Sequence, residues 1–182
     1  MSTVIDPAQD PAYEILALLG EELAAGDVEN RLVPADGLAP AQLVIPLTAE
    51  DGTTAAVNLC FLPGIDYPAV VQYLVALEHD VAPEAVETTA RFLHLVNSTL
   101  PLTGFELGES AAAVVFRYVQ PVSLSPLDPT LIAWPLSMIF HAVTRFDALV
   151  GEAATGASIE ALVAGYGRVM ADLYRDDAAT EQ

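Results

Sequence analysis

Basic residues are scarce in this sequence. Only six of its 182 residues are positively charged, all of them arginine, against 25 Asp and Glu, so the formal net charge is −19. Nucleic acids and anionic membranes bind proteins largely through Lys and Arg, so both would repel a chain this acidic. We therefore expect no nucleic-acid or membrane partner. The acidity indicates a well-solvated surface first, and complementarity to a basic protein segment is its functional alternative.

Cysteine is almost absent too. Cys60 is the only one, so no disulfide can form within the chain, and the further ligands of a cysteine metal cluster are not gathered near it. We expect Cys60 to be a small apolar core residue on a strand and not a reactive nucleophile. No cofactor is predicted.

Long hydrophobic runs are missing. The most apolar window, Leu131 to Val143, is about 13 residues long and contains Pro135 and His141, whereas a membrane span needs roughly 20. A buried helix is the better interpretation. Met1 to Pro7 shows no cationic segment followed by an apolar one, so we expect no secretory signal and a cytoplasmic protein.

Catalytic signatures are also missing. His79, His94 and His141 lie far apart in the sequence, so they form no helical metal pair. No Gly-x-Ser-x-Gly nucleophile motif occurs. The stretch from Gly151 to Ser158 has the glycine spacing of a phosphate-binding loop without its lysine, which favours a flexible link between two helices. We therefore expect a protein that is not an enzyme.

Apolar residues, at 53%, leave ample material for a core. Asp10-Pro11 predicts the start of a first helix, which Gly26 closes. Alternating apolar residues predict two strands, over 42–48 and 54–62, that form a hairpin. Pro46 cannot donate to a ladder, so it indicates an edge or an outward-facing amide.

The segment over 65–80 has no clear period. Its apolar run is rich in β-branched and aromatic residues, which favours a third strand, and a short helix is the rival. A second helix is expected from about 82 to 100. Alternation then predicts a second hairpin, with strands over 105–107 and 112–118.

Two more helices complete the predicted order. Asp128-Pro129 predicts the start of a long helix that is kinked or restarted at Pro135. The final helix is expected over about 158–175, followed by a frayed polar tail over 176–182. The order α-βββ-α-ββ-α-α indicates an α+β fold, an antiparallel sheet of about five strands flanked by helices. We expect all 182 residues to form a single domain with its core at about 10–150.

The second predicted helix carries three unusual residues. Asn97 lies on its apolar side, so its amide must be satisfied if buried, most simply by backbone groups at the corner that leads to Pro101. A structural cap is favoured there over ligand binding. Phe92 and Leu95 fall on the outer half, where they either pack under a loop or contact another chain.

The stretch from Phe92 to Tyr118 resembles the middle of the bacterial YbjN-like family, whose fold is similar to that of type III secretion chaperones. The likeness is carried by Asn97, by Leu100-Pro101-Leu102-x-Gly104-Phe105-x-Leu107 and by Val115-Phe116-Arg117-Tyr118. The resemblance implies a small acidic protein that acts by binding, usually as a dimer, with the helix before the second hairpin often at the dimer seam. It brings no catalytic residues.

We take Phe92, Leu95 and Arg91 as candidate contacts with a partner or a second copy, and Asn97, Pro101 and Gly104 as the structural corner. The leading hypothesis is a non-catalytic, cytoplasmic, dimeric domain, chaperone-like or regulatory, that holds a protein or peptide segment. The alternative is a small-molecule-binding or enzymatic domain whose site is assembled from distant residues, namely His94, Arg117 and Tyr118. A third possibility is a structural subunit of a larger complex.

Overall fold

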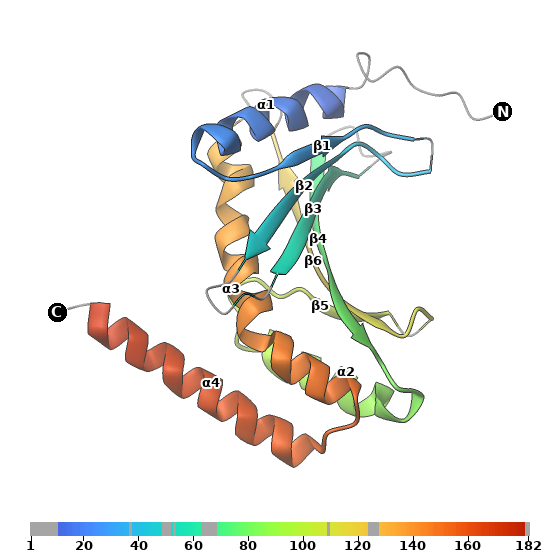
Figure 1. Ribbon diagram of the computed structural model, residues 1–182, viewed down its shortest axis with the longest axis vertical. Coiled ribbons are helices and arrows are strands. Elements are labelled where there is room, and N and C mark those ends of the chain that lie inside the picture. The colour runs from blue at the N-terminus through green and yellow to red at the C-terminus, as the bar shows by residue number, and fades with distance from the viewer. Residues whose placement is uncertain are drawn as a thin grey trace. The chain divides into compact units, whose positions relative to one another are not determined.

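The computed structural model describes residues 11–36, 38–48, 52, 54–62, 69–108, 110–123 and 128–180. They form an α+β fold with a six-stranded antiparallel sheet and four α-helices (Figure 1). The elements are α1 (Pro11–Ala25), β1 (Arg31–Val33), β2 (Gln42–Thr48), β3 (Thr54–Phe61), β4 (Ala69–Asp80), the 3-10 turn η2 (Pro83–Ala85), α2 (Val86–Asn97), β5 (Phe105–Gly108), β6 (Ala113–Val122), α3 (Pro129–Ala154) and α4 (Ile159–Thr180).

The strands lie in the order β1-β2-β3-β4-β6-β5. The expected hairpin of β2 and β3 is present, with Gln42 opposite Cys60 and Thr48 opposite Thr54. The ambiguous segment is a strand, β4, which pairs antiparallel with β3. Pro46 lies in the part of β2 beyond its pairing with β1, which ends at Val44, so its missing amide hydrogen costs no ladder bond on that side.

The expectation of about five strands missed β1. This strand has only three residues, too few to show an alternating pattern, and it is recognised through its antiparallel pairing with β2.

The chain divides into two compact units. Unit 1 comprises residues 1–75 and 117–140, and unit 2 comprises 76–116 and 141–182. The strands β4 and β6 and the helix α3 contribute residues to both units. Each unit therefore draws on two separate stretches of chain, which periodicity along the sequence does not indicate.

In unit 1, helix α1 packs on β1, β2 and β3 (Figure 1). Its buried face carries Leu16, Leu19 and Leu23, at the spacing of an amphipathic helix. The helix ends at Ala25, and the residue with a left-handed backbone is Asp27, at φ 60°, rather than the expected Gly26. The predicted cap Asp10 lies outside the described residues.

In unit 2, helix α2 contacts both β5 and α4. Edge-to-face aromatic pairs fill this core: the ring centroids of Phe105 and Phe116 are 5.0 Å apart, and those of Phe105 and Phe146 are 6.4 Å apart. Leu162 on α4 is fully buried, so the core continues past the expected boundary at residue 150.

Helices α3 and α4 differ from the prediction at their ends. Helix α3 runs to Ala154, and Gly156, at φ +94°, lies just beyond its end, so the link that was expected from Gly151 is shorter. Helix α4 continues to Thr180, beyond the expected end near residue 175. Within the described residues, no helix has the length and apolar character that crossing a membrane requires.

Candidate functional site

The first turn of α3 is fixed by its cap. The backbone amide of Thr130 donates to the Asp128 carboxylate at 3.0 Å, and that of Leu131 donates to the Asp128 carbonyl at 3.2 Å. An aspartate in this position satisfies amides that have no acceptor within the helix. The helix start that Asp128-Pro129 predicted is therefore confirmed.

Helix α3 continues through Pro135 without a restart. Proline has no amide hydrogen, so the Leu131 carbonyl four residues earlier lacks its helical donor. The side-chain amide of Gln120 on β6 donates to that carbonyl at 2.9 Å. The hydroxyl of Tyr73 on β4 donates to the next carbonyl, that of Ile132, at 2.7 Å. Two strands thus supply donors where the proline interrupts the helix.

Tyr73 is fully buried beside Tyr118, with ring centroids 5.8 Å apart. Burial, with a smaller effect from Tyr118, raises the pKa of Tyr73 well above its ordinary value. The phenol therefore stays protonated and keeps donating to α3.

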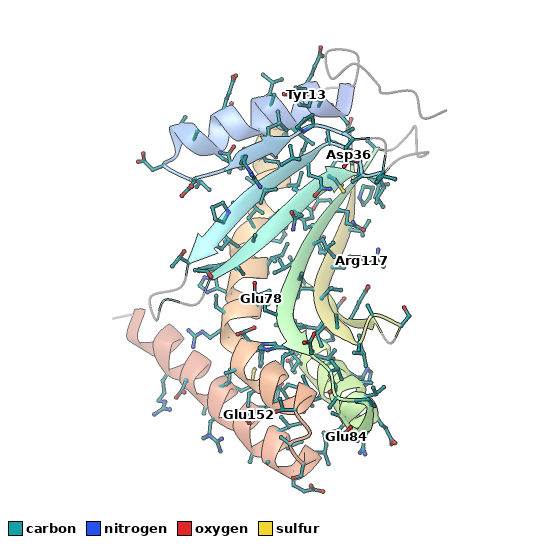
Figure 2. The ribbon with its side chains drawn as sticks, turned by 45° about the vertical axis from the view of Figure 1, so that its right-hand side comes forward. Tyr13, Asp36, Glu78, Glu84, Arg117 and Glu152 are labelled. Atoms are coloured by element: carbon teal, nitrogen blue, oxygen red, sulfur yellow. The ribbon has the colours of Figure 1, made fainter. Side chains whose placement is uncertain are left out.

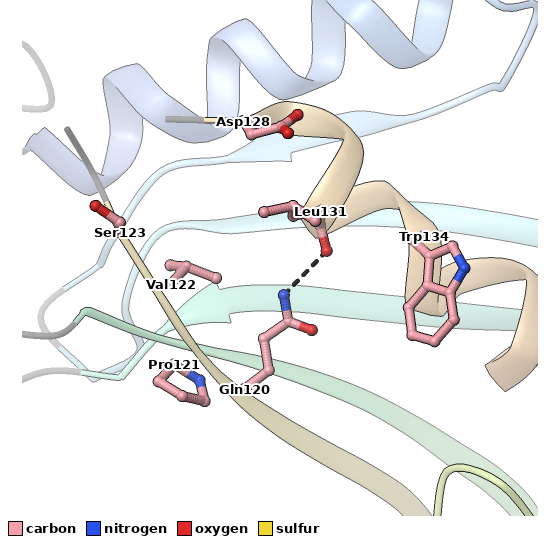
Figure 3. Close-up of a pocket in the computed structure, with 7 residues that line it drawn as sticks. All are labelled: Gln120, Pro121, Val122, Ser123, Asp128, Leu131 and Trp134. Carbon is pink, nitrogen blue, oxygen red and sulfur yellow. Dashed lines mark hydrogen bonds between the residues drawn. The ribbon is translucent and has the colours of Figure 1, made fainter. Parts of the chain in front are cut away.

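A hollow lies next to this junction, between the end of β6 and the start of α3 (Figure 3). Its volume is about 360 Å³. It is lined by Gln120, Pro121, Val122, Ser123, Asp128, Leu131 and Trp134. Val122 is buried, whereas Leu131 is 61% and Trp134 57% exposed. An apolar concavity thus opens beside two large exposed apolar side chains.

The exposure of Leu131 and Trp134 follows from helical geometry. The two residues are three apart, so they share a face of α3. The neighbouring Ile132, Leu136 and Ile139 are buried. The expectation of a wholly buried helix over 131–143 was therefore wrong for its first turns. A pair three residues apart and off the buried stripe was the signal that could have revealed the site.

The hollow has an acidic setting. Asp128 lines it, and none of the described lining residues is basic. The described residues of unit 1 include seven Asp and Glu against two arginines, Arg31 and Arg117. The hollow is therefore a mainly apolar site in a unit whose described charged side chains are mostly acidic.

The candidate contacts on α2 do not share one environment. Phe92 is fully buried within unit 2. Its predicted position on the outer half of the helix was therefore wrong. The reason is that the buried stripe of α2 runs through Thr89, Phe92, Leu93 and Val96, at the spacing of a single helix face, so Phe92 belongs to the apolar face and not to the outer half. Leu95 is partly exposed and Arg91 is exposed. Phe92 therefore presents no surface to a second chain.

The corner residues act on the backbone. The Asn97 amide nitrogen donates to the Phe105 carbonyl at 2.8 Å, and its oxygen accepts from the amides of Gly104 and Phe105 at 3.2 and 3.1 Å. Gly104 is required because a Cβ there would lie 2.5 Å from the Phe116 ring. Pro101 is exposed at the turn. Asn97 is thus the structural cap that the sequence favoured over a ligand contact.

The residues of the alternative site are divided between the two units. Arg117, which is labelled in Figure 2, precedes Tyr118 on β6, and consecutive side chains of a strand project to opposite faces of the sheet. Tyr118 lies against Tyr73 in unit 1, whereas His94 is an exposed residue of unit 2. Among the described residues, no group of three or more His, Cys, Asp and Glu could hold a metal ion.

One polar pair was not anticipated. The Nε2 atom of His79 on β4 lies 2.9 Å from the Asp147 carboxylate on α3, and both side chains are partly exposed. The imidazole also lies against Gly151, where a Cβ would come within 2.9 Å of Cε1. Residues 68 apart in sequence give no periodic signal of such a pair.

Cys60 is a buried free thiol on β3, as expected of a core residue. Burial raises its pKa, which keeps it in the less nucleophilic thiol form.

Comparison with known proteins finds no match to a family model, to a curated protein or to a solved structure.

Proposed function

We propose that this chain is a non-catalytic protein-binding domain, chaperone-like or regulatory, that holds a segment of a partner protein in the hollow at the start of α3. The observation that carries the proposal is the pair of exposed apolar side chains, Leu131 and Trp134, beside an apolar concavity of about 360 Å³. Tryptophan is among the residues that most often dominate the free energy of protein binding.

The energetic argument rests on water-exposed apolar area. Fully burying a leucine side chain contributes about 1.5 to 3 kcal/mol, and an indole presents a larger apolar surface. Leu131 and Trp134 keep more than half of their surface exposed, so most of this free energy is still to be gained on binding.

The site is also held in place before binding. Asp128 caps the helix and Gln120 ties its first turn to β6, so both walls of the hollow are fixed by hydrogen bonds. These two contacts form when the chain folds, so a partner segment loses less free energy to the ordering of the helix start and the strand end.

Three further points belong to the same proposal. The protein acts in the cytoplasm, it resembles the YbjN-like family and the type III secretion chaperone fold, and it works as a homodimer. Phe92 is buried, so the dimer contact that we propose on α2 is limited to Leu95 and Arg91.

Selection from a displayed peptide library tests the binding site. The full-length protein and its Trp134→Ala variant are used as baits, with Leu18→Ala as the matched control. Leu18 is 55% exposed and belongs to unit 1, but it does not line the hollow. We expect segments that bind the wild type and Leu18→Ala equally and lose binding to Trp134→Ala. Equal binding to all three proteins would place the site elsewhere.

Light scattering tests the dimer separately. Leu95→Asp should convert a dimer into a folded monomer, because it adds a charge to a partly exposed position. Phe92→Asp should unfold the protein instead, because it buries a carboxylate in the core. A monomeric wild type would contradict the dimer and would not affect the proposal that a partner binds at the hollow.

A further inference from the structure

We infer that the segment held in the hollow is cationic, with an apolar side chain that enters the hollow and neighbouring Lys or Arg side chains that lie against Trp134 and Asp128. This inference rests on the proposed function, because it names the chemistry of the segment bound at the same site.

The polar groups of the hollow are the first argument. The Gln120 amide nitrogen is committed to the Leu131 carbonyl, so its oxygen is turned away from that bond, toward the side of the hollow where Trp134 lies (Figure 3). The Asp128 carboxylate also lines the hollow. Both offer acceptors, and a cationic N–H group forms its strongest hydrogen bonds with a carboxylate.

The indole of Trp134 is the second argument. More than half of this side chain is exposed at the edge of the hollow. The face of an indole attracts an ammonium or guanidinium group, more strongly than the rings of Tyr or Phe do. A Lys or Arg stem can also cover the apolar ring while its head stays in water.

The charge of the surroundings is the third argument. The described residues of unit 1 include seven acidic and two basic side chains, and none of the described residues that line the hollow is basic. Summed charge of one sign accelerates the association of the opposite charge and disfavours like charge. An acidic segment would associate more slowly and bind more weakly, and a nucleic acid would meet the same repulsion.

Calorimetric titration of the full-length protein tests the inference. Three synthetic peptides share one apolar core, taken from the selected segments, and differ only in flanking residues, which are Lys and Arg, Ser, or Glu. We expect the basic peptide to bind about tenfold more tightly than the neutral one, the acidic peptide to bind least, and the difference to shrink in high salt.

The outcomes separate the two claims. Equal binding of all three peptides, with loss of binding in Trp134→Ala, would overturn the cationic preference and leave the proposed function standing. Binding of the peptides that is unchanged by Trp134→Ala would overturn both.

A pair of variants isolates the local carboxylate. Asp128→Asn removes the charge and retains the helix cap, because asparagine caps a helix about as well as aspartate. We expect the basic peptide to bind several-fold more weakly to it and the neutral peptide to bind unchanged. Glu14→Gln removes an exposed charge of the same unit outside the hollow and should change little. Equal effects of the two substitutions would contradict a role for Asp128.

Discussion

The side-chain amide of Gln120 donates to the carbonyl oxygen of Leu131 across 2.9 Å, which is the carbonyl that Pro135 leaves without a helical donor. A strand residue thus supplies the hydrogen-bond donor that the helix lacks. Both residues line the hollow, so local stability and the shape of the site depend on the same contact.

Removing this donor should cost stability only while the proline is present. We expect Gln120→Ala to lower the free energy of unfolding by about 0.5 to 1 kcal/mol, because the Leu131 carbonyl loses its protein partner. In a Pro135→Ala background the backbone amide of residue 135 supplies a donor, so the same substitution should cost almost nothing. Urea unfolding of the four proteins measures the coupling.

An equal loss in both backgrounds would show that Gln120 acts through packing and not through the carbonyl that Pro135 exposes.

Gly104 should tolerate no side chain. A methyl group there would lie 2.5 Å from the Phe116 ring, so we expect Gly104→Ala to destabilise the protein by about 2 kcal/mol or more. Gly167→Ala is the control, because a Cβ at this exposed position on α4 meets nothing within 4 Å. It should stabilise the helix by about 0.5 to 1 kcal/mol. Thermal unfolding compares the two, and a neutral Gly104→Ala would contradict the close approach.

Asn97→Ala should loosen the corner before β5. The substitution removes the acceptor for two backbone amides and the donor to the Phe105 carbonyl, at an expected cost of about 2 to 3 kcal/mol. Hydrogen exchange of the Gly104 and Phe105 amides should accelerate more than that of the β6 amides. Ser98→Ala, at an exposed neighbouring position, should stay within about 0.5 kcal/mol of the wild type. Unchanged exchange at Gly104 and Phe105 would be inconsistent with the observed bonds.

Tyr73 should make stability fall at alkaline pH. Its pKa is raised in the folded state, so the unfolded chain loses this proton first, at its ordinary pKa near 10. The contribution of Tyr73 to folding is therefore fully present below about pH 10 and is lost as the pH rises above that value. Tyr73→Phe loses the bond to Ile132, so it should be less stable at neutral pH by about 1 kcal/mol and should decline less steeply above pH 10. Parallel pH profiles for the two proteins would contradict this.

The local rules of chain geometry predicted most elements. Asp128 capped α3 as expected, Pro46 lay where β2 is an edge, and the run after residue 68 was a strand. These features depend on the conformational preferences of single residues and of short periods. The strand β1 was not predicted because its three residues are too few to show an alternating pattern.

The site was harder to predict than the fold. Phe92 was predicted on the outer half because the apolar face of α2 was drawn through Asn97, whereas the buried stripe runs through Thr89, Phe92 and Val96. Trp134 was overlooked because an apolar window reads as core whichever way its residues face. The hydrogen bond from Gln120 to the Leu131 carbonyl joins residues that are 11 apart in two different elements. Only the three-dimensional arrangement reveals it.

The indole N–H resonance of Trp134 gives the most direct test of partner binding at the hollow, because the chain has a single tryptophan and the signal is unambiguous. We would titrate the ¹⁵N-labelled protein with a selected basic segment and follow the indole together with the backbone amides of Val122 and Leu131. Binding at the hollow predicts that these three signals shift together and saturate at one dissociation constant. Saturable shifts elsewhere, with the indole signal unmoved, would contradict it.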